Sequence, residues 1–183
     1  ALMAAYKKAF LADSVTNMPE LQANFQKFMG RAQEIMTAEA QKKQEAERQA
    51  RLNSPEVKAN IEAGKKYIAD LKAKDAEIKT TQSGLSYKVL KEGAGDAITP
   101  ASTVKVNYVG RHIDGTEFDK GEGIDFPVAR VVPGFAEGLQ LMKKGSKYTL
   151  YIPGDLGYGV DGTGDIKPME TLVFDLEVVD IVK

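Results

Sequence analysis

Residues 103–119 read Thr-Val-Lys-Val-Asn-Tyr-Val-Gly-Arg-His-Ile-Asp-Gly-Thr-Glu-Phe-Asp. Val104, Val106 and Tyr108 occupy alternate positions, so they share one face of a predicted strand that we expect to end on Tyr108. Because the two valines are apolar, this face points inward and takes the tyrosine ring with it.

A tight turn is predicted after this strand at Asp114-Gly115, a dipeptide that favours hairpins. The turn sends the chain back along the strand and brings Phe118 and Asp119 towards the end of the sheet that carries Tyr108. The sequence therefore predicts a site where a phenol, an aromatic ring and a carboxylate meet.

The composition of the 183-residue chain is that of a globular protein with a proper core, at 43% hydrophobic and 28% charged residues. Its formal charge of -1 supplies no basic field, so we predict no nucleic-acid partner. The lack of cysteine excludes disulfides, zinc thiolate sites and a cysteine nucleophile. Residues 1–10 have the pattern of a helix interior rather than of a signal peptide, so we expect the natural N-terminus to lie upstream.

Residues 1–79 are rich in Ala, Gln, Glu and Lys and hold only two of the 17 glycines, which predicts an all-helical arm. We expect one helix ending near Leu11, one from about Pro19 to Arg51, and one from about Pro55 to Asp75 that is capped by Ser54.

The middle helix carries an apolar stripe with spacings of three and four residues, formed by Leu21, Phe25, Phe28, Ala32, Ile35 and Met36. Its second part, residues 41–51, is charged and predicts a solvated face. Two explanations of the stripe stay open: burial against a second copy of the chain in a homodimer, or a bundle completed by residues that precede this sequence.

Residues 80–183 hold 15 of the 17 glycines and several short β-rich runs, which predicts a sheet. One strand is expected over residues 85–90. Two more have inward faces formed by Tyr148, Leu150 and Ile152, and by Leu172, Phe174, Leu176 and Val178.

One short helix is expected in this half, with Phe135, Leu139 and Met142 on one face and Gly145 as its stop. The predicted fold class is α+β: a helical arm over residues 1–79 and a second domain over residues 80–183, in which one helix covers a sheet.

Five motifs follow one another in this second domain: Val106-Asn-Tyr-Val-Gly110, Asp114-Gly-Thr-Glu-Phe-Asp119, Val131-Val-Pro-Gly-Phe-Ala-Glu-Gly-Leu139, Ile152-Pro-Gly-Asp-Leu-Gly-Tyr-Gly159 and Thr171-Leu-Val-Phe-Asp-Leu-Glu177. Together they resemble the FKBP-type peptidyl-prolyl cis-trans isomerases, in that family's order. The helical half is similar to the dimerising arm of the two-domain, macrophage-infectivity-potentiator-like bacterial members. The resemblance implies a strongly bent antiparallel sheet wrapped around the short helix, with a proline pocket between them.

The resemblance implies three catalytic residues, Asp119, Tyr158 and Tyr108, and neither a metal nor a cofactor. The substrate-binding residues that it implies are all apolar or aromatic: Phe118, Phe126, Val131, Val132, Phe135, Ile166 and Phe174. Phe126 is expected at the rim. Phe135 stands where the family usually has a tryptophan, so we expect a deeper pocket floor, and the loop of residues 159–165 is slightly short.

Rotation about an X-Pro bond breaks amide conjugation against a barrier of about 18–20 kcal/mol and needs neither proton transfer nor a nucleophile. By the resemblance, Asp119 is held by Tyr108 close to the carbonyl that precedes the proline. The Tyr158 hydroxyl or the Ile166 amide then holds this carbonyl as it rotates.

Other interpretations of the same residues are weaker. His112 is the only histidine and permits a Ser-His-Asp triad on paper, but beside a hairpin turn we expect it to be solvated. The acids between residues 114 and 125 lack the spacing of a calcium loop. Residues 157–162 match a dinucleotide fingerprint, but no helix is predicted after them.

The predicted function is a peptidyl-prolyl cis-trans isomerase, or rotamase, that assists protein folding. The alternative is a non-catalytic proline-binding chaperone whose helical arms cradle clients, whereas a purely structural dimer does not explain the converging polar groups. The implied partners are proline-containing peptides, unfolded proteins, a second copy of the chain and the family's macrolide inhibitors. The expected location is the periplasm or cell envelope, with the cytoplasm as the alternative.

Overall fold

The computed structural model describes residues 18–182. The helix expected to end near Leu11 lies outside the described residues, as does the side chain of Leu21. The chain divides into two compact units, residues 1–47 and 48–183. The division predicted from the sequence at residue 79 is a different one and stays a prediction.

In the first unit the described residues belong to helix α2 (Met18–Leu52). This confirms the middle helix of the predicted arm. Phe25, Ile35 and Met36 are 48%, 47% and 71% exposed in the single chain. The charged segment of residues 41–51 is also exposed, as predicted. Within residues 18–182, no helix combines the length and the apolar character that crossing a membrane requires.

The second unit contains helix α3 (Pro55–Lys74), which begins where the sequence predicts. The side-chain oxygen of Ser54 accepts a hydrogen bond from the backbone N–H of Val57 at 3.3 Å, so Ser54 is the expected N-cap. Pro55 follows in the first turn, where its missing N–H costs no helical hydrogen bond.

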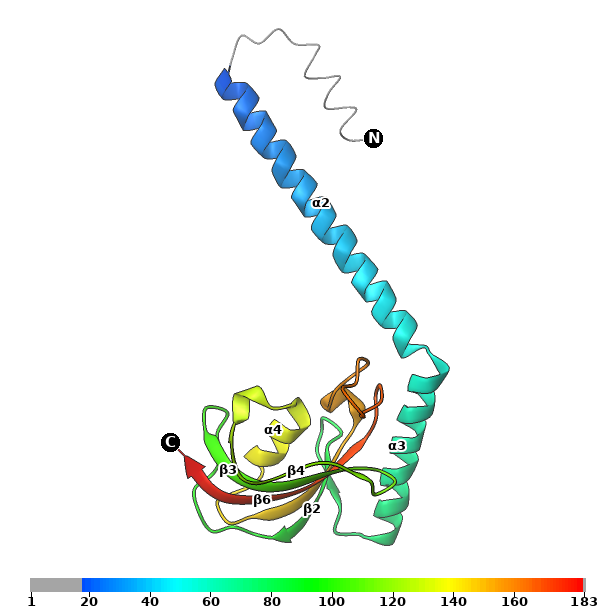
Figure 1. The fold of residues 1–183 in the computed structure, drawn as a ribbon, viewed down its shortest axis with the longest axis vertical. Coiled ribbons are helices and arrows are strands. Elements are labelled where there is room, and N and C mark those ends of the chain that lie inside the picture. Colours follow the sequence, from blue (N-terminus) through cyan, green and yellow to red (C-terminus); the bar gives the residue numbers. More distant parts are fainter. Residues whose placement is uncertain (1–17, 183) are drawn as a thin grey trace. The chain divides into compact units, whose positions relative to one another are not determined.

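The described strands of this unit form one antiparallel sheet (Figure 1). The strands are, in their order across the sheet, β1 (Lys79–Thr80), β2 (Ser86–Lys91), β5 (Lys147–Ile152), β6 (Leu172–Val182), β3 (Thr103–His112) and β4 (Glu117–Pro127). Helix α4 (Pro133–Gln140) lies over one face of the curved sheet (Figure 1). The predicted α+β class is therefore confirmed.

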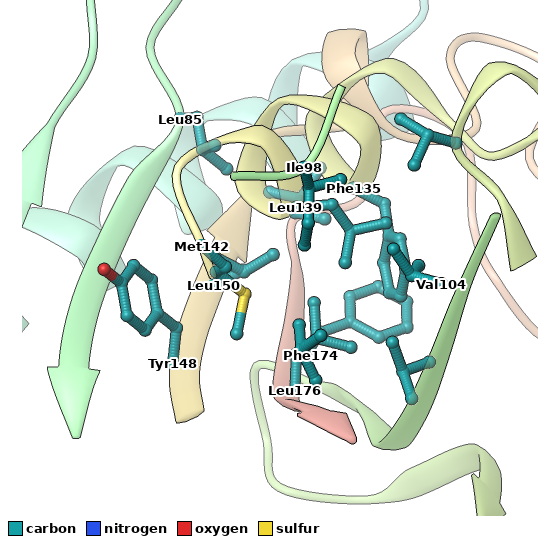
Figure 2. Close-up of a cluster of buried hydrophobic side chains, with 14 of the residues drawn as sticks. Leu85, Ile98, Val104, Phe135, Leu139, Met142, Tyr148, Leu150, Phe174 and Leu176 are labelled. Carbon is teal, nitrogen blue, oxygen red and sulfur yellow. The ribbon is translucent and has the colours of Figure 1, made fainter. Parts of the chain in front are cut away.

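The main core lies between α4 and the sheet, and Figure 2 shows Phe135 and Leu139 of α4 beside Leu150, Phe174 and Leu176 of the strands. These strand residues belong to the inward faces that the sequence predicts. A Cβ on Gly138 would stand 2.3 Å from Leu150 Cδ1, so the absence of a side chain lets the helix approach the sheet closely.

Helix α3 covers the opposite face of the sheet. Tyr67, Ile68 and Leu71 pack against a smaller cluster that contains Tyr151 and Val173. These two strand residues alternate with residues of the main core, so they face the other side. The sheet is thus packed between α4 and α3.

Two predicted boundaries are wrong. The strand predicted to end on Tyr108 is β3, and it continues to His112. It does so because β3 lies between β4 and β6 and is paired on both sides along this stretch. Helix α4 ends at Gln140 rather than near Gly145, since the backbone N–H of Met142 bonds Leu139 O at 3.0 Å in a tighter turn. Met142 still reaches the core and is 1% exposed.

Candidate active site

A hairpin of strands β3 and β4 brings Tyr108 and Asp119 together. The predicted turn at Asp114-Gly115 is present, with Gly115 at a φ of 91° and its backbone N–H bonded to His112 O at 3.0 Å. The Tyr108 hydroxyl donates to Asp119 Oδ2 at 2.8 Å. The phenol and the carboxylate therefore meet as the sequence predicts.

The surroundings of the two tyrosines keep their hydroxyl groups protonated. Burial, followed by the hydrogen bond and the charge of Asp119, raises the pKa of Tyr108 to about 12. Burial, and then the negative charge of Asp119, also raises the pKa of Tyr158. Both hydroxyl groups therefore remain hydrogen-bond donors at neutral pH. Tyr158 is 36% exposed, so its side chain is accessible from solvent.

An aromatic cluster adjoins this polar pair, with Phe135 of α4 at its centre. The Phe135 ring meets three other rings edge-on, with centroid distances of 6.4 Å to Tyr108, 5.9 Å to Phe126 and 5.3 Å to Phe174. Tyr108 and Phe126 also meet edge-on at 5.4 Å. Such contacts are favoured because the positive edge of one ring meets the negative face of the next.

Phe118 of β4 extends the aromatic cluster and packs over β3. Its ring meets that of Phe174 at 5.6 Å and 87°. Both rings lie over Gly110, where a Cβ would stand 2.7 Å from Phe118 Cζ and 2.9 Å from Phe174 Cε1. The strand thus needs a glycine at this position for the two rings to pack on it.

The remaining predicted site residues lie on segments that connect the strands. Val131 and Val132 connect the short 3-10 helix η1 (Val128–Arg130) to α4, and both are half-buried against the main core. Ile166 is 7% exposed and belongs to that core. Tyr158 follows the short 3-10 helix η2 (Gly154–Leu156).

The Ile166 amide differs from the prediction that it could hold a substrate carbonyl. Its N–H donates to Thr163 O at 2.8 Å, and Thr163 N–H donates back to Ile166 O at 3.0 Å. Because this amide is engaged within its own turn, the Tyr158 hydroxyl remains as the candidate donor.

His112 also differs from its prediction, because it is not solvated. Its Nδ1 atom lies 2.9 Å from Glu170 Oε1, and its side chain is 14% exposed. Its ring contacts Phe118 at a centroid distance of 5.1 Å. No local pattern in the sequence predicts this pair, since the two residues are 58 positions apart.

The polar groups of the site do not form a metal centre. Within residues 18–182, no three His, Asp or Glu side chains gather as they would to hold a metal ion. The chemistry that the described arrangement supports is the binding of an apolar ring beside a fixed carboxylate and phenol.

Comparison with known proteins gives matches over both parts of the chain. Residues 95–179 match the sequence family described as FKBP-type peptidyl-prolyl cis-trans isomerase, and residues 1–89 match the domain amino terminal to it. The Outer membrane protein MIP of Legionella longbeachae is 36% identical over 180 residues, which cover 91% of this chain and 76% of that protein.

Two further similar proteins carry the name of the same family. A probable FKBP-type peptidyl-prolyl cis-trans isomerase FkpA of Neisseria meningitidis is 43% identical over 155 residues, 82% of this chain. The crystal structure of FkpA from Escherichia coli superposes with a TM-score of 0.65 at 38% identity, over 98% of this chain and 80% of that one. The chain spans only about half the length of several curated relatives, including 56% of the Neisseria protein and 52% of one from Haemophilus influenzae.

Proposed function

Because the chain belongs to the FKBP-type peptidyl-prolyl cis-trans isomerase family, we propose that it accelerates X-Pro bond rotation in peptides and unfolded proteins, and so assists protein folding. The observation that carries the proposal is the hydrogen bond between Tyr108 and Asp119 at the border of the aromatic cluster. Ordinary core packing does not require a carboxylate beside these rings.

The aromatic cluster acts on the solvation of the amide. Phe135, Phe174, Phe126 and Phe118 provide apolar surface for the proline ring, and water is displaced from the amide as this ring binds. The planar, conjugated amide is more dipolar than the twisted one, so it loses more stabilisation when water leaves. The barrier to rotation therefore falls without any covalent step.

The polar groups orient the rotating carbonyl. Tyr108 fixes the Asp119 carboxylate, so its charge acts at one position rather than over several rotamers. The Tyr158 hydroxyl stays protonated beside this charge and is the donor that we assign to the substrate carbonyl. Each tenfold acceleration requires about 1.4 kcal/mol, so a few such interactions suffice.

Exchange NMR on a short Leu-Pro peptide tests this proposal. The wild-type chain is expected to accelerate cis-trans exchange, and Asp119→Ala to lower kcat/KM about tenfold, the loss of roughly 1.4 kcal/mol. Asp180→Ala is the control, because it also removes an aspartate carboxylate, one that accepts a lysine ammonium and a backbone N–H outside the site. A folded wild-type chain that leaves the exchange rate unchanged contradicts the proposal and favours the non-catalytic proline-binding chaperone.

The second candidate function is client binding by a homodimer joined through α2, and it coexists with catalysis. Its support is the exposed apolar surface of that helix. Phe25, Met29 and Met36 recur at spacings of four and seven residues and are 48%, 50% and 71% exposed. A stripe of this kind is the surface that a second α2 helix would cover.

Sedimentation velocity tests the dimer. The wild-type chain is expected to sediment as a dimer and Met29→Glu as a monomer, because a charge would enter the apolar contact. Ala38→Glu is the control, since nine residues place position 38 on the opposite side of the helix from Met29. A monomeric wild-type chain at high concentration contradicts the dimer.

The remaining assignments follow from the relatives. We assign residues 1–79 to a dimerising arm and residues 80–183 to the isomerase domain, supported by family matches that meet between residues 89 and 95. We place the protein in the periplasm or cell envelope, because one relative is named an outer membrane protein. Cell fractionation tests the location, and recovery in the cytoplasmic fraction alone contradicts it. Macrolide inhibitors of the family are expected to compete with proline peptides.

A further inference from the structure

We propose that His112 and Glu170 are positioning residues that hold the two sides of the substrate site at a fixed separation. The inference rests on the proposed function and deepens it, because it assigns to this pair the tightness of substrate binding. The two side chains are 14% and 12% exposed, the most buried of the ion pairs among residues 18–182. Each member of a polar pair that is withdrawn from water needs the other, since a buried polar group without a hydrogen-bond partner has lost its hydration with nothing in exchange.

The first contact of the pair is with the aromatic side of the site. His112 ends β3, and its ring lies 5.1 Å from that of Phe118, at a tilt of 58°. Phe118 rests in turn on Phe174, and Asp119 follows it directly in β4. The imidazole therefore packs against one side of Phe118 and limits how far this ring can swing away from the cluster.

The second contact is with the segment that carries Ile166. Glu170 uses its two carboxylate oxygens differently: Oε1 lies 2.9 Å from His112 Nδ1, and Oε2 accepts the backbone N–H of Lys167 at 2.8 Å. The Glu170 N–H also donates to Lys167 O at 3.2 Å. One carboxylate thus ties the end of β3 to the residue that follows Ile166.

The backbone beside Glu170 shows why this tie matters. Met169 has a φ of 54°, in the left-handed region that residues other than glycine adopt at a cost. The Met169 N–H donates to Gly159 O at 2.7 Å, which closes the loop of residues 159–169 that carries Ile166 and begins directly after Tyr158. The base of the loop is also held by Asn60 Nδ2, which donates to Pro168 O at 2.8 Å, and the Glu170 carboxylate supplies the bond that reaches the aromatic side.

The consequence is a specific kinetic signature. If the pair only sets the distance between Phe118 and the loop, its loss widens the site for substrate and transition state alike. Uniform loss of binding raises KM and leaves kcat unchanged. Glu170→Ala is expected to raise KM for a Leu-Pro peptide about tenfold with kcat within about twofold of wild type.

Glu170→Gln separates positioning from simple loss of stability. The amide oxygen can accept the Lys167 N–H, and the amide nitrogen can donate to His112 Nδ1, so both bonds are retained. KM should return to within about threefold of wild type. The imidazole tautomer should invert at the same time, from a protonated Nδ1 in the wild type to a protonated Nε2 in the variant.

The test combines peptide exchange kinetics with nitrogen-15 NMR of the imidazole, which is simple to assign because the chain has one histidine. His112→Phe keeps a ring against Phe118 but lacks the bond to Glu170, so it is expected to raise KM as Glu170→Ala does. It therefore supplies the test if Glu170→Ala folds poorly. Asp180→Ala, which removes a more exposed carboxylate that also accepts a cation and a backbone N–H, should leave both constants unchanged.

The outcomes distinguish the two proposals. If the folded wild-type chain does not accelerate exchange, the proposed function fails and the positioning role fails with it. If the wild type is active and both Glu170→Ala and His112→Phe keep the wild-type KM, only the positioning role is refuted. A fall in kcat at constant KM, or a tautomer that is unchanged in Glu170→Gln, also overturns it.

Discussion

Gly110→Ala is the substitution through which the packing of the site can be tested most directly. The added methyl group would stand 2.7 Å from Phe118 Cζ, 2.9 Å from Phe118 Cε2 and 2.9 Å from Phe174 Cε1. Ordinary carbon contacts lie at about 3.5–4.0 Å, so the atoms must separate by roughly 1 Å. The backbone cannot supply this shift, because Gly110 is paired with Phe174 of β6 on one side and Asp119 of β4 on the other.

The rings must therefore move, and they are not equally free. Phe174 is 4% exposed and locked in the core, whereas Phe118 is only half-buried and is the ring expected to swing outward. Overpacking of this kind costs about 1–3 kcal/mol. The reduced freedom of the unfolded chain returns about 0.4–1 kcal/mol. The net loss of unfolding free energy is about 0.5–2 kcal/mol.

Urea unfolding followed by circular dichroism measures this loss, and peptide exchange kinetics measures the accompanying rise in KM. Phe118→Leu in the Gly110→Ala background removes the ring atoms nearest the new methyl group and should recover at least half of the lost stability. Gly30→Ala is the control, because nothing lies within 4 Å of its added Cβ, and it should stabilise the helix by about 0.5–1 kcal/mol. Unchanged stability in Gly110→Ala would refute the close packing of both rings on this strand.

Three further predictions concern the floor of the site, the buried phenol of Tyr148 and the N-cap of α3. Phe135→Trp should lower KM for proline peptides, because a larger ring offers more surface to the pyrrolidine; a peptide titration that shows unchanged or weaker binding contradicts this. Burial, followed by the charge and the hydrogen bond of Glu92, raises the pKa of Tyr148 to about 12. The folded state therefore keeps a proton that the unfolded chain loses near pH 10. The free energy of unfolding should fall as the pH rises from about 10 to 12. Unfolding titrations at pH 8 to 12 measure this slope, which should be shallower in Tyr148→Phe, and an equal slope in both chains argues against the phenol. Ser54→Ala should destabilise the second unit by about 1 kcal/mol through the lost bond to the Val57 N–H, whereas Ser54→Asp should retain most of the stability in the same unfolding assay.

The sequence predicts the parts of the site that depend on local periodicity. The hairpin between Val104 and Asp119 follows from alternation and from one turn dipeptide, and both are properties of neighbouring residues. The inward faces of β5 and β6 follow from the same alternation. The position of Phe135 in the core follows from the three-and-four spacing of one short helix.

The sequence does not predict features that depend on pairing between distant segments. His112 is followed by a turn and therefore looks solvated, but Glu170 approaches it from a loop 58 residues away. The Ile166 amide looks available until the loop closes on itself through Thr163. The predicted end of α4 near Gly145 is wrong because the chain tightens after Gln140, while Met142 stays buried without being helical.

The most direct measurement of the central claim locates the proline of a bound substrate. In a complex of the isotope-labelled chain with a Leu-Pro peptide, we expect nuclear Overhauser contacts from the pyrrolidine protons to the rings of Phe135 and Tyr158. Exchange cross-peaks between the cis and trans forms of the same peptide should appear in that sample. Contacts confined to α2, with no exchange cross-peaks, would show that the aromatic cluster is not the site of isomerisation.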